Sequence, residues 1–327
     1  MARRLRGRHV SERFALVGDV GGTNCRLGIM SSEGRLVERI NNLDSRSLAP
    51  EELLENMEWL YANSKEHFNG TNSFVGVSIA LAGLVSQKSG LMEASPHLGH
   101  YVGIPFLDMF RERFPGIHHM ENDATAASLA EYRLGAGIGA TNMVYVSVGT
   151  GIGGGLILNG NLYRGSGGFA GEIGHIYAGS EGLCACGKYG CLEATNSGLG
   201  IENQARDGLL SPRHNGLESD DWSVESQKIE GGAKSGDVAS LELIKEIGKN
   251  IGVGLGSVVN VMNPDTLVIG GGLSELGEDL LNPIIASLRA TAFHQMETDL
   301  RIRVSSLGDD GGMLGAGLLL FDMYSEP

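Results

Sequence analysis

The pattern of apolar and polar positions predicts that the chain opens with short paired strands. Residues 14–19 form an apolar run that ends in an acid, and residues 25–30 form a second run after the pair Gly21–Gly22. Residues 35–40 can supply a third strand. Apolar runs of this length, separated by turn residues, are typical of a meander of neighbouring strands.

Helical spacing follows and alternates with further strands. Pro50 opens a segment, extending to about residue 67, in which apolar side chains recur every three or four positions. Residues 104–114 and the alanine-rich segment after Asp123 predict further helices, whereas residues 74–80 and 117–120 predict strands. Strands that come first and then alternate with helices indicate an α/β fold.

The second half of the chain repeats this order. Residues 142–148 and 151–158 predict a strand pair about a glycine turn. A helix over 237–262, a strand over 266–269, a helix after Pro283 and a final helix over 313–324 follow. Two halves that open alike suggest a duplicated fold with a cleft between them. The polar stretch 209–232 is expected to be a surface loop or the edge of a lid, without chemistry.

The length and the net charge of the chain favour some classes of protein and disfavour others. The chain has 327 residues, which favours about two domains, and its formal net charge of −14 disfavours binding to nucleic acid or to an anionic membrane. Residues 1–13 are basic but lack the apolar core of a secretory signal, so a short disordered arm is expected. Residues 141–163 carry no charge, but their glycines favour two buried strands over a membrane span. We therefore expect a cytoplasmic protein with no transmembrane segment, no nucleic-acid partner and no membrane partner.

Three of the four cysteines crowd together at Cys184, Cys186 and Cys191, separated by glycines. This spacing suits a turn whose sulfurs converge on a tetrahedral metal ion, and His175 lies upstream as the candidate fourth ligand. Three cysteines and one histidine would hold a structural zinc ion. The alternative, a disulfide with free thiols, is less compatible with a cytoplasmic protein. Cys25 stands alone beside a glycine turn and is expected to pack as a small apolar side chain.

The 51 glycines are about twice the usual number, and they gather in tight clusters, three of which follow predicted strands. These clusters lie at residues 19–24, 149–155 and 270–272. Glycine lets the backbone approach a ligand closely, so such turns can cradle phosphate with their N–H groups. Asp19 could hold Mg²⁺ through water, although a hairpin with an acid at its tip would explain the first cluster alone. None of the clusters matches a P-loop or a dinucleotide-binding fingerprint.

An acidic triplet, Glu121–Asn122–Asp123, closes a predicted strand and opens the alanine-rich helix. Asp123 stands at the expected position of an N-cap, and capping alone would explain it. The functional alternative is a general base, which accepts the proton of a sugar hydroxyl as that oxygen attacks a γ-phosphate. Asn122 would hydrogen-bond the same sugar.

Together these residues resemble the ROK family of sugar kinases, in which glucokinases are prominent, over nearly the whole chain from Asp19 onward. The most specific part is Glu172-Ile-Gly-His175, followed by the run from Cys184 to Glu193 that holds the three thiols. The resemblance implies two ribonuclease H-like (actin-like ATPase) domains around a cleft, with a zinc-stapled loop in the larger one. The small domain would comprise residues 1–122 with a C-terminal helix, 309–327, packed back on it, and the large domain residues 123–308.

The resemblance also implies a role for each matching residue. Asp123 would be the catalytic base of an ATP-dependent glucokinase or hexokinase acting on the 6-hydroxyl of glucose. The implied sugar ligands are Gly83, Asn122, Asp123, Glu172, His175 and Glu193. The implied ligands of ATP with Mg²⁺ are Asp19, Gly21, Gly22, Thr23, Gly149, Thr150, Gly151, Gly270, Gly271 and Gly272. The implied zinc ligands are His175, Cys184, Cys186 and Cys191. A homodimer or homotetramer is implied as well.

Two positions near the implied sugar pocket depart from the family pattern. His97 replaces an asparagine that is common in the family's glucokinases, and Ala82 replaces the proline before Gly83. Kinases for N-acetylmannosamine, N-acetylglucosamine, fructose or allose therefore stay open as alternatives, and His97 could equally be a partly exposed loop histidine. A sugar-sensing repressor of the family would carry a DNA-binding domain, for which we expect the 18 residues before Asp19 to be too few. A zinc-stapled binding protein without activity is disfavoured by the intact glycine turns.

Overall fold

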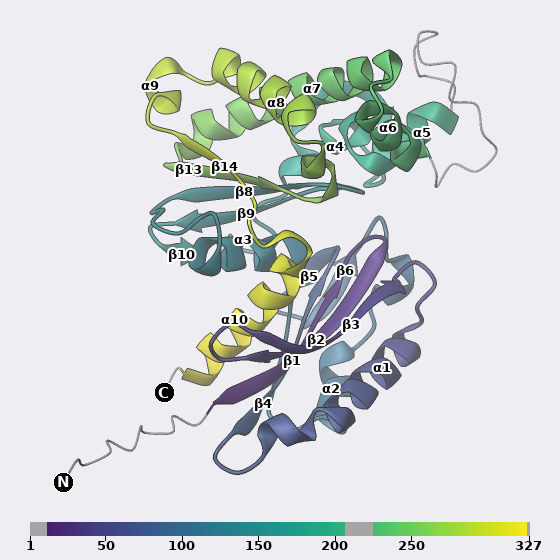
Figure 1. Ribbon diagram of the computed structural model, residues 1–327, viewed down its shortest axis with the longest axis vertical. Coiled ribbons are helices and arrows are strands. Elements are labelled where there is room, and N and C mark those ends of the chain that lie inside the picture. Colours follow the sequence, from purple (N-terminus) through teal and green to yellow (C-terminus); the bar gives the residue numbers. More distant parts are fainter. Residues whose placement is uncertain (1–11, 207–224, 326–327) are drawn as a thin grey trace.

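Two five-stranded β-sheets with equivalent strand orders organise the chain (Figure 1). The computed structural model describes residues 12–206 and 225–325. In each sheet an antiparallel meander of three strands is extended by two parallel strands from later in the sequence. The duplication predicted from the sequence is thus confirmed at the level of strand topology.

The N-terminal sheet has the order β3-β2-β1-β4-β7. Its strands are Leu36–Asp44 (β3), Asn24–Ser31 (β2), Arg13–Val20 (β1), Ser73–Leu81 (β4) and Ile117–Asn122 (β7). β1 pairs antiparallel with β2 and parallel with β4. The central strands β1 and β4 are buried over most of their length, because helices cover both faces of the sheet, and such strands are continuous apolar runs in the sequence.

Three helices cover the N-terminal sheet. Helices α1 (Pro50–Asn63) and α2 (Phe106–Arg113) pack on one face, and α10 (Gly311–Ser325) packs on the other. Pro50 begins α1, as predicted, and a short 3₁₀ turn, η1 (Lys65–Phe68), follows the end of that helix. The predicted helical spacing corresponds to the buried face of α1, formed by Leu53, Leu54, Met57 and Leu60.

The C-terminal sheet has the order β10-β9-β8-β13-β14. Its strands are Asn161–Leu162 (β10), Ile152–Leu158 (β9), Met143–Val148 (β8), Thr266–Gly270 (β13) and Arg301–Val304 (β14). The uncharged stretch of the sequence forms β8 and β9, which are buried over most of their length and confirm the predicted pair of buried strands, and the short, less buried β10. Helices α7 (Val238–Met262) and α8 (Glu278–Thr291) pack together on the outer face of this sheet.

Helix α3 (Asp123–Leu134) lies between the two sheets beside α10 (Figure 1). Small residues let these two helices approach closely, since a Cβ on Gly315 would lie 1.8 Å from the carbonyl oxygen of Ala126. One side of α3 packs on β8 and β9, and the other packs on α10. The N-terminus of α3, which carries Asp123, is therefore fixed between the two sheets.

Short elements connect the sheets and helices. In chain order they are β5 (Leu84–Ser86), β6 (Leu91–Ala94), η2 (Gly99–Tyr101), η3 (Ile173–His175), β11 (Tyr177–Leu183), β12 (Tyr189–Cys191), α4 (Glu193–Asn196), α5 (Gly198–Arg206), α6 (Glu225–Lys234), η6 (Gly272–Leu276), α9 (His294–Glu297) and η7 (Gly308–Asp310).

Three predictions from the sequence were wrong in detail. Helix α8 begins at Glu278 and contains Pro283 five residues further on, where the missing N–H of proline leaves one carbonyl of the helix without its usual donor. Part of the stretch 209–232, expected to be a loop, belongs to helix α6, and residues 207–224 lie outside the described residues. Asp123 is not the N-cap of α3, since Asn122 occupies that position. Residues 1–11 of the expected N-terminal arm also lie outside the described residues.

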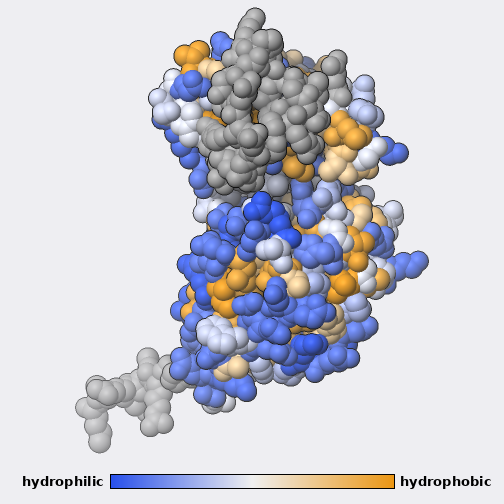
Figure 2. Space-filling model, turned by 90° about the vertical axis from the view of Figure 1, so that its right-hand side faces the viewer, coloured by the Kyte–Doolittle hydropathy of each residue, from blue (hydrophilic) through white to orange (hydrophobic). Residues whose placement is uncertain are grey.

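Among the described residues, no helix combines the length and the apolar character needed to cross a membrane. Helix α7 has 25 residues, but four of them are charged, Glu242, Lys245, Glu246 and Lys249. The face of the molecule shown in Figure 2 carries mostly hydrophilic side chains with separate apolar patches among them.

Candidate active site

A pocket of about 190 Å³ is lined by residues that follow the strand ends of both sheets. Of the predicted sugar ligands, Gly83, Asn122 and Asp123 line it from the N-terminal half. Glu172, His175 and Glu193 line it from the C-terminal half. All six residues predicted to contact sugar therefore line one pocket, which we call the small pocket.

Asp123 is the first residue of α3, and its carboxylate is held by neighbouring donors. Its Oδ1 accepts hydrogen bonds from the backbone N–H of Ala124 at 2.8 Å and from the side-chain amide of Asn122 at 3.0 Å. Burial raises the pKa of Asp123, whereas the hydrogen bond from Ala124 and the charge of His97 lower it. A raised pKa makes this carboxylate a stronger base than an exposed aspartate.

Asn122 caps α3 and thereby orients the strand end beside Asp123. Its Oδ1 accepts from the backbone N–H of Thr125 at 2.9 Å, which satisfies one donor of the first helical turn. Its amide nitrogen donates to the carbonyl oxygen of Gly83 at 3.1 Å. Gly83 is needed at this position, because a Cβ there would lie 2.6 Å from the sulfur of Met92.

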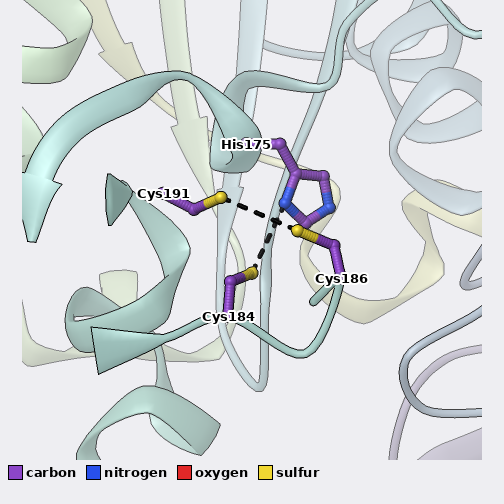
Figure 3. A group of neighbouring side chains, drawn as sticks. All are labelled: His175, Cys184, Cys186 and Cys191. Carbon is purple, nitrogen blue, oxygen red and sulfur yellow. Dashed lines mark hydrogen bonds between the residues drawn. The ribbon is translucent and has the colours of Figure 1, made fainter. Parts of the chain in front are cut away.

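The four predicted metal ligands converge beside the small pocket (Figure 3). The sulfurs of Cys186 and Cys191 are 3.7 Å apart, and the sulfur of Cys184 is 3.6 Å from Nδ1 of His175. All four ligand atoms lie within 4.8 Å of one another. A tetrahedral zinc ion with Zn–S bonds of about 2.3 Å and a Zn–N bond of about 2.1 Å requires ligand separations of about 3.6–3.8 Å. The geometry and the donor set therefore fit zinc.

His175 links this cluster to the small pocket. While Nδ1 faces the thiols, Nε2 lies 3.8 Å from a carboxylate oxygen of Glu172. Burial raises the pKa of Glu172, and the nearby His175 lowers it. One ring thus contacts the thiol cluster on one edge and a pocket carboxylate on the other.

Glu193 makes a second link, between the thiol cluster and a glycine turn. Its Oε1 lies 3.8 Å from the sulfur of Cys184, and its Oε2 accepts a hydrogen bond from the backbone N–H of Ile152 at 2.7 Å. A Cβ on Gly151 would lie 2.6 Å from that Oε2. Glycine at 151 therefore permits the carboxylate to approach the turn between β8 and β9.

The first two glycine turns meet each other. The turn after β1 is closed by a hydrogen bond from the backbone N–H of Gly21 to the carbonyl of Asn24 at 3.0 Å. Its Thr23 hydroxyl lies 3.0 Å from the hydroxyl of Thr150, in the turn after β8. Both turns line a wide pocket of about 630 Å³, together with Gly22, Gly149 and two cations, Arg26 and Arg46. We call it the wide pocket.

A third pocket, of about 430 Å³, shares Asp123 with the small pocket and contains Asp19, Gly21, Gly149, Gly271 and Gly272. We call it the rear pocket. Burial raises the pKa of Asp19 to about 7, and the negative charge of Asp123 adds to this effect. Of the residues predicted to bind the nucleotide, Gly270 alone lines none of the small, wide and rear pockets. It is the last residue of β13, and a Cβ there would lie 2.8 Å from the Cβ of Ser305.

Several residues that line or support these pockets were not predicted. Arg26 lines the wide and rear pockets and pairs with Asp309, which lines both as well. Glu131, fully buried in α3, accepts hydrogen bonds from the Ser305 hydroxyl and the backbone N–H groups of Ser306 and Leu307. Its only signal in the sequence is an acid on the helix that Asp123 begins, and an acid on a helix is usually exposed.

His97, for which the sequence left two interpretations open, lines both the small and the wide pocket. Its ring lies between the two glycine turns, since a Cβ on Gly22 would lie 3.1 Å from its Cγ and a Cβ on Gly151 would lie 3.2 Å from its Nε2. The side chain is half-buried. This placement favours a pocket residue over a solvated loop histidine.

Comparisons with known proteins show similarity over nearly the whole chain. The model of the ROK family matches residues 16–322. A glucokinase from Halalkalibacterium halodurans is 31% identical over 322 residues, covering 95% of this chain and 96% of that protein. A crystal structure of a ROK family glucokinase from Streptomyces griseus, in complex with glucose and AMPPNP, matches with a TM-score of 0.79 at 29% identity, over 94% of this chain and 98% of that one. The ROK hexokinase from Thermus thermophilus matches with a TM-score of 0.77 at 26% identity, over 97% of this chain and 100% of that one.

Proposed function

Since the chain belongs to the ROK family and is an ATP-dependent sugar kinase, we propose that it is a glucokinase or hexokinase that phosphorylates the 6-hydroxyl of glucose. The observation that carries this proposal is the position of Asp123 in the walls of two pockets. The small pocket contains the predicted sugar ligands, and the rear pocket contains Asp19 with Gly271 and Gly272. A carboxylate between an acceptor subsite and a donor subsite is well placed to take the proton of the attacking hydroxyl.

In this proposal Asp123 is the general base. Its Oδ1 is held by Ala124 and Asn122, so we assign proton acceptance to Oδ2. The sugar is oriented by Asn122, Glu172, His175 and Glu193, and phosphoryl transfer then depends on placing the 6-hydroxyl in line with the γ-phosphate. Mg²⁺, when bound with ATP, supplies charge neutralisation on the phosphates, and Asp19 is the residue we assign to its water shell.

The glycine turns are proposed to bind the phosphates. Their backbone N–H groups, with the hydroxyls of Thr23 and Thr150, supply donors at the wall of the wide pocket. Arg26 adds a cation there, in a chain whose net charge is −14. Local donors of this kind are needed because the charge of the whole protein repels a nucleotide.

Zinc is proposed to brace the sugar subsite. Held by His175, Cys184, Cys186 and Cys191, it would be a closed, structural ion that takes no part in proton or phosphoryl transfer. Its effect on the pocket would pass through His175, whose other ring nitrogen faces Glu172. Loss of the ion would free that ring and loosen Glu172.

We also propose that residues 1–122 with the C-terminal helix 309–327 form one domain and residues 123–308 form the other. The packing of α10 on β1 and β4 supports this division. Closure of the two domains on sugar would exclude water and so limit wasteful hydrolysis of ATP. The contact between Thr23 and Thr150, one from each domain, is expected to belong to the closed arrangement.

The identity of the sugar is tested by a coupled ADP-release assay across glucose, fructose, mannose and the N-acetylhexosamines. Glucose is favoured because the relative from Streptomyces griseus was solved with glucose bound. We expect the highest kcat/KM for glucose. A higher kcat/KM for N-acetylmannosamine, N-acetylglucosamine or fructose would assign the chain to that alternative, and no turnover of any sugar would favour a sugar-sensing repressor.

A further inference from the structure

One buried ion pair joins the two halves of the chain beside the small pocket. The side chain of Glu121, in β7, has no exposed surface, and its Oε2 accepts a hydrogen bond from Nε of Arg164 at 2.7 Å. Arg164 follows β10 of the C-terminal sheet. Removal of the arginine would leave a buried carboxylate without its cation, which is strongly unfavourable.

The carboxylate of Glu121 is also tied to the strand end that carries the proposed base. Its Oε1 accepts a hydrogen bond from the backbone N–H of Asn122 at 3.0 Å and another from the side-chain amide of Gln87 at 3.4 Å. Asn122 in turn hydrogen-bonds Asp123. One oxygen of Glu121 therefore orients the base side of the pocket, and the other oxygen holds Arg164.

Arg164 is at the start of the segment that presents Glu172 and His175. The carbonyl of Arg164 accepts a hydrogen bond from the backbone N–H of Ala170 at 3.0 Å, which closes residues 164–170 into a loop. This loop contacts the N-terminal half, since a Cβ on Gly168 would lie 3.6 Å from the carbonyl oxygen of Val85. Glu172 follows directly, without an intervening helix or strand.

We propose that Arg164 is a positioning residue for the sugar subsite, which it sets by pinning the loop 164–172 to the strand end of Asn122 and Asp123 through Glu121. This inference rests on the proposed function, because it takes the small pocket as the sugar subsite. Glu172 of this loop lines the small pocket, whereas no residue of the loop 164–172 lines the wide or the rear pocket, so the ion pair acts on the sugar side of the site. The ion pair thus fixes the distance between the residues that hold the sugar and the base that acts on it.

The test uses full-length Arg164→Met, Arg164→Lys and Glu121→Gln, with Arg133→Met as the matched control. Arg133 also makes an ion pair between distant segments, with Asp322 at 2.7 Å, but it lines none of the three pockets. We expect Arg164→Met to raise the KM for sugar about tenfold, because small misplacements of binding groups are costly, and to leave the KM for ATP within about twofold. Arg164→Lys, which keeps the charge, should recover part of the loss, and Arg133→Met should change neither KM.

Hydrogen exchange of residues 165–176 in the ligand-free protein provides a second readout that does not depend on activity. Exchange should be faster in Arg164→Met and Glu121→Gln than in the wild type, and unchanged in Arg133→Met. Equal rises of both KM values, or unchanged exchange of this segment, would overturn the positioning role. If Arg164→Met fails to fold, the same two criteria apply to Arg164→Lys. A wild type that phosphorylates no sugar would overturn the proposed function, and the exchange data would still decide whether the ion pair holds the loop.

Discussion

The hydroxyl oxygens of Thr23 and Thr150 lie 3.0 Å apart, although 127 residues separate them in the sequence. Each hydroxyl belongs to the turn between the first two strands of its own sheet, so equivalent turns of the duplicated fold meet at this contact. Both residues line the wide pocket with Arg26. The duplication thus brings two sets of backbone donors together where we propose that the phosphates of ATP bind.

Replacement of Thr150 by valine keeps the shape of the side chain and removes its hydroxyl. We expect the KM for ATP to rise about tenfold to 150-fold, since a hydrogen bond to a charged group contributes about 1.5–3 kcal/mol. The affinity for sugar, measured by calorimetry without nucleotide, should stay unchanged. Thr150→Ser, which keeps the hydroxyl, is the control. An unchanged KM for ATP in Thr150→Val would remove Thr150 from the phosphate subsite.

The thiol cluster predicts a metal content of about one zinc ion per chain in the purified protein. Cys186→Ala should lower this zinc content. It should also lower the melting temperature and the affinity for sugar, because a site with three ligands no longer holds His175 against Glu172. Cys25→Ala removes a buried cysteine outside the cluster and is the matched control, which should keep its zinc. Freshly purified wild type without zinc would contradict the assignment.

The buried carboxyl group of Asp19 is expected to make the stability of the folded protein depend on pH. Its pKa is raised by burial to about 7 in the folded chain, from an ordinary value of 3.8. The folded state therefore binds this proton more tightly than the unfolded state, and stability is lost as pH rises from about 4 to about 7. In Mg²⁺-free buffer, Asp19→Asn should stabilise the protein at pH 8 by on the order of 1–3 kcal/mol, and by less at pH 5.

Asp265→Asn is the control, and its effect on stability at pH 8 should be opposite in sign to that of Asp19→Asn. Although burial raises the pKa of Asp265, hydrogen bonds from the backbone N–H groups of Asn142 and Thr141 and from Thr266 and Arg301 lower it to about 2. This carboxylate stabilises the folded state above its unfolded pKa, so its replacement should lower the melting temperature at pH 8. A lower melting temperature for Asp19→Asn at pH 8 would show that the Asp19 charge is compensated in the folded protein.

Local patterns of the sequence predicted much of the fold. Continuous apolar runs marked β1, β4, β8 and β13, and helical spacing marked the buried face of α1, because these features depend on neighbours close in the sequence. The spacing of Cys184, Cys186 and Cys191 marked the metal cluster for the same reason. The cap of α3 was displaced by one residue, since Asn and Asp are both good caps and only the backbone geometry distinguishes them.

Contacts between distant segments were not predicted from the sequence. Glu121 and Arg164 are 43 residues apart, and Glu131 and Ser305 are 174 residues apart. An acid on a strand or helix gives no local sign that it is buried, because its partner is supplied by tertiary packing. Both pairs link residues of β7 or α3 to later segments of the chain, and only the folded structure brings those segments together.

The central claim is that Asp123 takes the proton from the 6-hydroxyl of glucose as phosphate is transferred from ATP. The most direct measurement compares ADP release by wild type and Asp123→Asn at saturating glucose and Mg-ATP, with glucose binding to both measured by calorimetry. Asp123→Asn is expected to bind glucose about as tightly as the wild type, while its kcat falls by about 10²-fold to 10⁴-fold, the usual contribution of a general base. Turnover by Asp123→Asn at a rate near that of the wild type would contradict the claim.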